Sequence, residues 1–316
     1  MSPSIASAVP DPRAEQAQGG HRYGASLKQR ERRVGLLLVV PALIAFSAVV
    51  LLPFLQSLRL SLYKYTIDMQ APEFIGLGNF ARLLADPDMA TVWLNTLVFV
   101  LATTAGTFVI ALAWALMVNQ SFKGRAFVRA ASLLPWVLPS TVTAFLAAWI
   151  FNGQYGVLNA ILLKAGLIAE PISWLAEQTG AMAAVVIARV WLSVPLFMAF
   201  FLAGLQGVSQ DQVDAARVDG CENLGVLRHV VLPHLAPTMI IVTILGAMGN
   251  LQTFDVIYAL TQGGPIKATT MLSVEVYKQA FQNWDTGTAC AVGVLWFLTI
   301  AVPTVFYLRL LFKREA

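Results

Sequence analysis

Six long apolar runs constrain the fold of this chain more than any other feature. A helix that crosses a bilayer needs about 20 mostly apolar residues, and each run is long enough. Charged residues make up 12% of the chain, whereas a soluble domain carries about 25%. The predicted spans are 34–58, 93–119, 128–151, 181–205, 237–260 and 287–312. The sequence therefore predicts an all-α, polytopic membrane protein with six transmembrane helices.

The distribution of basic residues predicts the orientation of these spans. Cytoplasmic loops of membrane proteins are enriched in Lys and Arg. Here basic residues gather in the N-terminal tail, in the loops 120–127 and 206–236, and at the C-terminal end. Alternating spans place these segments on one side, so both termini are expected in the cytoplasm. The net charge of +4 is then a topology signal and not a nucleic-acid footprint.

The chain divides into a polar tail and a membrane domain. Residues 1–33 are rich in Pro, Ala, Gln and Arg, and we expect a mobile cytoplasmic tail there. Residues 34–316 are expected to form one permease domain.

The long inner loop, 206–236, is predicted to fold as two short helices joined by a glycine. Ser209, followed three residues later by Gln212, is typical of a capping box at the start of a helix. Gly220 can supply the left-handed turn that ends the first helix. Pro233 and Pro237 mark the entry to the fifth predicted span, 237–260.

This helix–glycine–helix unit resembles the EAA loop of ABC-type import permeases. The family pattern is Glu-Ala-Ala, three residues, Gly, nine residues, Ile, one residue, Leu-Pro. The spacing is kept here, with Asp in place of Glu and Val in place of Ile. The matching residues are Asp214, Ala215, Ala216, Gly220, Val230, Leu232 and Pro233. The resemblance implies that the loop docks on a separate ATP-hydrolysing subunit; the residues alone also allow an ordinary hairpin that links two spans.

The resemblance covers roughly residues 34–312. The stretch from Phe254 to Pro265, with its Gly-Gly-Pro end, is similar to the first of the two non-identical membrane subunits of maltose-type permeases. The chain is thus identified as a member of the binding-protein-dependent carbohydrate permease family. This implies a type I ABC importer permease fold in a bacterial cytoplasmic membrane. The implied partners are a second, non-identical permease, an ATPase dimer, an extracytoplasmic sugar-binding protein and a carbohydrate substrate.

The same resemblance implies a substrate path along the two spans that flank the loop. Carried over position by position, the candidates are Trp191, Leu192, Ser193 and Leu196 in the fourth span, and Gly246, Gly249, Asn250 and Thr253 in the fifth. The spacing of three and four residues puts the second set on one helix face. There, small residues leave room and polar side chains can bind sugar hydroxyls. Helix–helix packing explains the same residues equally well.

Two charged residues lie inside predicted spans, where charges are costly and usually functional. Arg189 and Asp255 both fall in the outer half of the membrane, and an ion pair between them is a reasonable hypothesis. A role in the substrate path is one interpretation of both residues. The alternative is that Arg189 pairs for structural reasons or reaches towards the interface.

Other classes of function are less well supported by the sequence. The chain lacks the Gly-x4-Gly-Lys-Ser/Thr phosphate loop, so we expect ATP and magnesium on the partner ATPase, no cofactor or metal in this chain, and no catalysis by it. An ion- or proton-coupled secondary carrier is the main alternative. Such a carrier favours inverted repeats and midplane carboxylates, which only Asp255 approaches. A membrane-embedded enzyme would need clustered His, Asp or Glu at a membrane face, and we find none.

Overall fold

A computed structural model describes residues 35–315 of the chain, without the side chains of Pro303 and of 306–315. The predicted tail, 1–33, lies outside the described residues. Two compact units, Met1–Arg59 and Leu60–Ala316, are described separately.

The first unit consists, where it is described, of one apolar helix that runs from Gly35 and ends at Leu60. A π-helical turn, η1 (Ser47–Leu51), interrupts it before α2 (Leu52–Leu60). None of its described residues is buried within the chain. Such a helix needs lipid or another protein around it, and its bounds lie within two residues of the first predicted span, 34–58.

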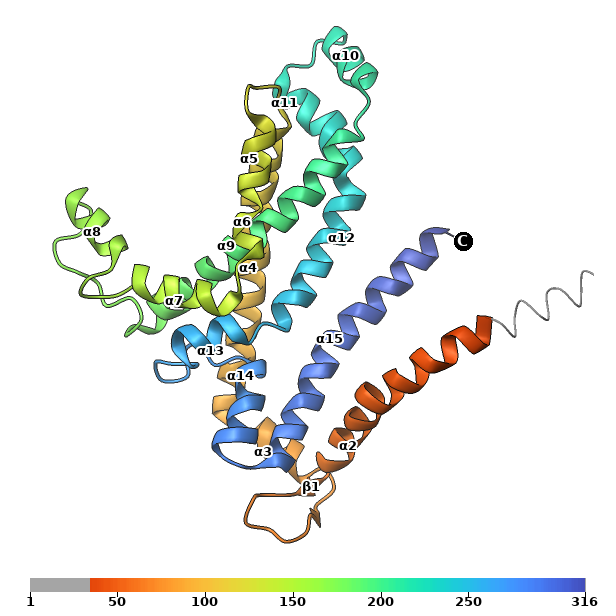
Figure 1. Cartoon of the computed structure of the whole chain (residues 1–316), viewed down its shortest axis with the longest axis vertical. Coiled ribbons are helices and arrows are strands. Elements are labelled where there is room, and N and C mark those ends of the chain that lie inside the picture. The colour runs from red at the N-terminus through yellow and green to blue at the C-terminus, as the bar shows by residue number, and fades with distance from the viewer. Residues whose placement is uncertain (1–34, 316) are drawn as a thin grey trace, which may run out of the picture. The chain divides into compact units, whose positions relative to one another are not determined.

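Three long helices form the centre of the second unit (Figure 1). They are α4 (Pro87–Asn119), α9 (Gln178–Gln206) and α12 (Leu232–Leu251). Asp86 caps α4, because its carboxylate accepts a hydrogen bond of 2.9 Å from the backbone N–H of Asp88. The other elements are β1 (Tyr63–Lys64), β2 (Glu73–Phe74), α3 (Gly78–Ala85), α5 (Arg125–Ser132), α6 (Leu134–Val137), α7 (Ser140–Ile150), α8 (Val157–Lys164), α10 (Gln210–Val218), α11 (Asn223–Val226), η2 (Leu227–Val231), α13 (Asp255–Thr261), α14 (Leu272–Tyr277), η3 (Lys278–Gln282) and α15 (Thr286–Glu315).

Small residues allow the central helices to approach closely. Ala184 and Ala188 of α9 are buried in one core cluster with Phe99 of α4. A second cluster joins Ala111 and Ala115 of α4 to Phe201 of α9 and Leu235 of α12. In membranes, small side chains at helix interfaces favour close packing of this kind. The core of the second unit therefore lies along α4 and α9.

The third predicted span is not one straight helix. Two helical segments, Arg125–Val137 and Ser140–Ile150, meet at an angle of 94°. Leu138 adopts an extended conformation, with ψ at 139°. The residue before a proline is disfavoured in the helical region, and Pro139 follows Leu138. The prediction of a single helix over 128–151 is wrong for this reason.

The fifth predicted span is displaced towards the loop. A continuous helix runs from Asn223 and ends at Leu251, and α13 follows as a separate short helix. Pro233 lies within this helix, two residues after the π-helical turn η2, and local π-helical adjustments are a known way for membrane helices to accommodate proline. The predicted bounds, 237–260, are therefore wrong at both ends.

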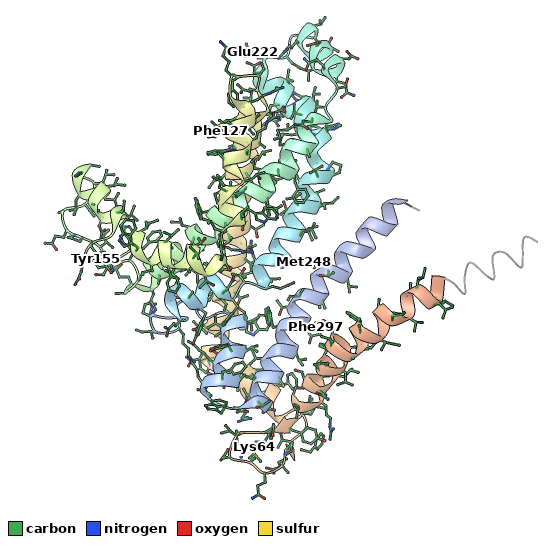
Figure 2. All side chains as sticks on the ribbon, in the orientation of Figure 1. Lys64, Phe127, Tyr155, Glu222, Met248 and Phe297 are labelled. Atoms are coloured by element: carbon green, nitrogen blue, oxygen red, sulfur yellow. The ribbon has the colours of Figure 1, made fainter. Side chains whose placement is uncertain are left out.

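Among the described residues, four helices are long and apolar enough to cross a membrane, or five if the bent pair is one span, and Thr286–Val302 is a shorter apolar helix. Polar turns lie at the two ends of the second unit: Glu222 follows α10 at one end, and Lys64 lies in β1 at the other (Figure 2). The chain is thus a polytopic helical membrane protein.

Candidate substrate path and coupling loop

A cavity of about 490 Å³ opens between α9, α12 and the bent pair. Seven of the residues predicted to lie on the path line it: Arg189, Leu192, Ser193, Leu196, Gly246, Gly249 and Asn250. Cavities of about 300–1,000 Å³ are typical of small-molecule sites. The structure therefore brings most of the predicted path residues together, and contact with a substrate stays a prediction.

The third wall of this cavity was not predicted from the sequence. Trp136, Leu138 and Ser140 line it from the break between α6 and α7. A straight third helix gives no reason to select them, and the signal that could have done so is Pro139. The remaining lining residues are Phe197, Phe200, Val242 and Leu245.

Three predicted residues lie outside this cavity. Trp191 lines a second, apolar cavity of about 520 Å³ with Trp114 and Met198, because adjacent helical residues point in different directions. Thr253 is buried, and its hydroxyl donates to the Gly249 carbonyl at 3.2 Å. Asp255 is exposed at the start of α13.

Arg189 binds an amide instead of a carboxylate. Its Nε donates to Oδ1 of Asn250 at 3.0 Å, and Nδ2 of Asn250 donates to the hydroxyl of Thr104 at 3.1 Å. Asp255 is near enough to attract the guanidinium but forms no ion pair with it, since the ion pairs of the described residues are Arg217–Asp214 and Lys267–Asp88. The hypothesis of an Arg189–Asp255 ion pair is wrong. The polar chain that replaces it joins α9, α12 and α4.

The two glycines on the cavity face have different roles. A Cβ added to Gly246 would lie 2.0 Å from Cζ of Phe197, which is a severe clash. A Cβ added to Gly249 would meet nothing closer than a guanidinium nitrogen of Arg189, at 4.0 Å. Gly246 therefore serves helix packing, whereas Gly249 leaves space.

The helix–glycine–helix unit has the predicted form at its centre. Gly220 adopts a left-handed conformation, with φ at +87°. The N–H of Cys221 donates to the Ala216 carbonyl at 2.9 Å, and the N–H of Gly220 donates to the Arg217 carbonyl at 3.1 Å. This pair of bonds is a Schellman motif, which ends α10 at Asp219. Ser209 occupies the N-cap position as predicted, although its side chain makes no capping hydrogen bond.

The surface of α10 is unusually open. None of its residues is buried within the chain. Asp214 accepts a hydrogen bond from Gln210 at 3.1 Å, while Val218 is 88% exposed and Leu224, in α11, is 75% exposed. Exposed apolar side chains beside small alanines are typical of a surface that another protein covers.

The loop is connected directly to both helices that line the cavity. Helix α9 ends at Gln206, only a few residues before α10, and α11 continues through η2 into α12. Near this junction a Cβ added to Gly204 would lie 2.7 Å from Cδ2 of Leu235, so α9 and α12 touch there. Movement of the loop would therefore displace both walls of the cavity.

The Gly-Gly-Pro segment that follows α13 is held by side chains. The hydroxyl of Thr270 donates to the Gly263 carbonyl at 2.8 Å, and Nδ2 of Asn95 donates to the Lys267 carbonyl at 2.8 Å. Nζ of Lys267 binds Asp88 at 2.7 Å, and this hydrogen bond raises the pKa of Lys267 above its ordinary value. The segment is thus anchored to α4.

Long apolar helices and a cavity whose walls continue into an exposed loop are the features expected of a polytopic membrane permease. Residues 107–315 match the model of the family described as binding-protein-dependent transport system inner membrane component, and the chain belongs to this family.

Relatives along the whole chain agree with this assignment. The trehalose/maltose transport system permease protein MalF of Thermococcus litoralis is 32% identical over 295 residues, which cover 92% of this chain and 98% of the relative. The sulfoquinovosyl glycerol transport system permease protein SmoG of Agrobacterium fabrum is 30% identical, covering 93% and 95%.

A solved structure shares the fold. The crystal structure of a bacterial ABC transporter involved in the import of the acidic polysaccharide alginate matches with a TM-score of 0.76 at 21% identity, covering 92% of this chain and 98% of that chain. The chain is therefore a permease subunit of an ATP-driven importer in the inner membrane. It is not an enzyme, since ATP is hydrolysed by separate subunits. The family match and the named relatives do not favour the alternative of a secondary carrier.

Proposed function

We propose that this chain carries carbohydrates through a path that includes the 490 Å³ cavity. Aromatic rings of Trp136 and Phe200 lie in the lining with the polar side chains of Ser140, Ser193 and Asn250. Rings stack on the apolar faces of sugars, and a few placed polar groups fix orientation, as in other small-molecule sites. The names of the two relatives, for trehalose/maltose and for sulfoquinovosyl glycerol, support the same class of substrate.

The main observation behind the proposed transport is that the loop 206–236, here called the coupling loop, continues directly into both walls of the cavity. Asp214, Ala215 and Ala216 would face the ATPase subunit, and Gly220 would fix the angle between α10 and α11. Leu232 and Pro233 begin α12, so closure of the ATPase would move α12 and α9 together. Alternating access to the cavity then follows from movement of its walls.

The proposed assembly contains partners that complete the path. Phe200 and Leu245 line the cavity and are also exposed, 46% and 57% respectively, so a second, non-identical permease can close the open side. A pair of ATPase subunits would bind ATP and magnesium, and an extracytoplasmic sugar-binding protein would deliver the substrate.

The proposed topology has six spans with both termini in the cytoplasm. Besides the four long helices, the bent pair and α15 would each cross the membrane. The basic residues of the loops support this orientation.

Substitution of Gly220 by alanine tests the coupling role. A left-handed conformation costs an L-residue about 1–2 kcal/mol, so the docking conformation of the loop should be depleted about 5- to 30-fold. We expect co-purification with the ATPase and substrate-stimulated ATP hydrolysis in proteoliposomes to fall accordingly.

Gly293→Ala is the matched control, because Gly293 lies in α15 with nothing within 4 Å of an added Cβ. The coupling role is contradicted if Gly220→Ala stimulates ATP hydrolysis as fully as Gly293→Ala. Failure of the wild-type chain to co-purify with any ATPase would contradict the proposed assembly itself.

A further inference from the structure

Within the part of the chain that the structure describes, the lining of the cavity has one charged side chain and none of opposite charge. Arg189 is the only Asp, Glu, Lys or Arg among the described residues that line it. A charge within a membrane span is costly and normally has a partner. Its hydrogen-bond partner is the amide oxygen of Asn250, which is neutral, while the exposed carboxylate of Asp255 attracts the guanidinium from outside the cavity lining and forms no ion pair with it.

Most of the hydrogen-bonding capacity of Arg189 remains available to a ligand. A guanidinium has five N–H donors, and the bond from Nε to Asn250 uses one of them. Asn250 is itself fixed, because its Nδ2 donates to Thr104 and its side chain is 3% exposed. This bond holds the guanidinium in one orientation while its terminal nitrogens keep their donors.

Gly249 keeps one edge of the guanidinium uncovered. A terminal nitrogen of Arg189 is the nearest atom to the position that a Cβ on Gly249 would take, at 4.0 Å. Both residues line the cavity, so any side chain at position 249 would stand between this nitrogen and a ligand. A fixed, uncovered planar fork matches a carboxylate or sulfonate, which it can bind through two parallel hydrogen bonds.

We propose that the cavity takes a monoanionic carbohydrate, whose single carboxylate or sulfonate binds the terminal nitrogens of Arg189. The inference rests on the proposed carbohydrate transport and specifies its substrate class. The sugar ring would lie against the rings of Trp136 and Phe200, and Ser140 and Ser193 would face its hydroxyls. The single guanidinium of Arg189 would balance the single negative charge of such a sugar.

Uptake by the intact transporter with its binding protein, in proteoliposomes, tests this inference. The probes are mono-, di- and trisaccharides in matched pairs that differ only at C6, with a hydroxymethyl group in one and a carboxylate in the other. We expect uptake of an acidic member in preference to its neutral partner. Because a hydrogen bond to a charged group contributes about 1.5–3 kcal/mol, Arg189→Gln should reduce acidic-sugar uptake about 10- to 100-fold.

A second variant separates loss of charge from loss of folding. Asn250→Asp keeps the size of the side chain and places a carboxylate beside the guanidinium. Uptake of the acidic sugar should therefore again fall about 10- to 100-fold, while uptake of the neutral sugar rises relative to it. Lys164→Gln is the matched control for loss of one positive charge, because Lys164 is exposed at the end of α8, outside the cavity. We expect wild-type uptake from it.

The outcomes test the anionic substrate class separately from carbohydrate transport. Preference for neutral sugars, with uptake unchanged in Arg189→Gln, would overturn the anionic substrate class and leave carbohydrate transport standing. ATP hydrolysis without uptake of any sugar in the panel would overturn both. Equal losses for acidic and neutral sugars in Arg189→Gln and Asn250→Asp would show that Arg189 only supports the helix packing.

Discussion

Substitution of Gly246 by alanine should destabilise the permease, although the added side chain is a single methyl group. The methyl carbon would lie 2.0 Å from Cζ of Phe197. Carbon atoms in contact are separated by about 3.5–4.0 Å, so the ring or the helix must retreat by about 1.5–2 Å. Phe197 is 6% exposed and packs edge-on against Phe201, whose ring centroid lies 6.2 Å away. The ring is therefore confined on the side of Phe201, and it can move only towards the cavity that it lines.

The expected cost follows from this confinement. Added methyl groups in a well-packed core destabilise by about 1–3 kcal/mol. For a chain of this size, each kcal/mol lowers the unfolding temperature by about 2–4 °C. We expect Gly246→Ala to unfold about 2–12 °C below the wild type, as measured by thermal unfolding of the purified transporter in detergent.

Gly249→Ala is the matched control, since it lies on the same helix face and differs in its neighbour. Its methyl group would make an ordinary contact at 4.0 Å. Alanine is also favoured over glycine within a helix by about 0.5–1 kcal/mol. This variant should therefore unfold at or above the wild-type temperature.

A double substitution tests the proposed contact directly. Phe197→Leu removes the Cζ atom, so adding it to Gly246→Ala should recover part of the loss, with a coupling energy of about 0.5–3 kcal/mol. Equal unfolding temperatures for Gly246→Ala and Gly249→Ala would contradict a steric clash at position 246. Strictly additive losses in the double variant would refute the contact with Phe197.

Two further predictions concern the polar connections outside the cavity. The buried side-chain amide of Asn159 donates to the Gly153 and Ile172 carbonyls and accepts from Trp174. Each buried polar group left unpaired costs about 1–3 kcal/mol. Asn159→Leu should therefore lower the free energy of unfolding by several kcal/mol and make the segment before α9 sensitive to limited proteolysis. Resistance equal to that of the wild type would contradict this. Asp88→Asn should cost less than about 1 kcal/mol, since its ion pair with Lys267 is partly exposed, and the loss should shrink at high salt. Because the hydrogen bond to Asp88 raises the pKa of Lys267, the stabilisation from the protonated lysine is fully present below about pH 10.5 and is lost as the pH rises through the raised folded-state pKa. A large cost that persists at high salt would contradict the estimate.

The sequence predicted which residues of the fifth span share a face better than it predicted which cavity each side chain lines. Helical periodicity places Gly246, Gly249 and Asn250 on one face, and the structure shows that face lining the cavity. Trp191 illustrates the limit, because its residue type suggested stacking on a sugar while its position on α9 turns it towards a different cavity. Residue type and span number do not determine the direction of a side chain.

The class of protein and the form of the loop 206–236 could be predicted from the sequence alone. Apolar length requires a membrane, and Gly220 permits the left-handed turn that closes the Schellman motif, since both are local properties of the chain. Tertiary structure alone decided which neighbour each residue meets. The partner of Arg189 is Asn250 and not Asp255, and the clash that explains Gly246 comes from Phe197 on another helix. These contacts depend on how α4, α9 and α12 pack, which no local pattern specifies.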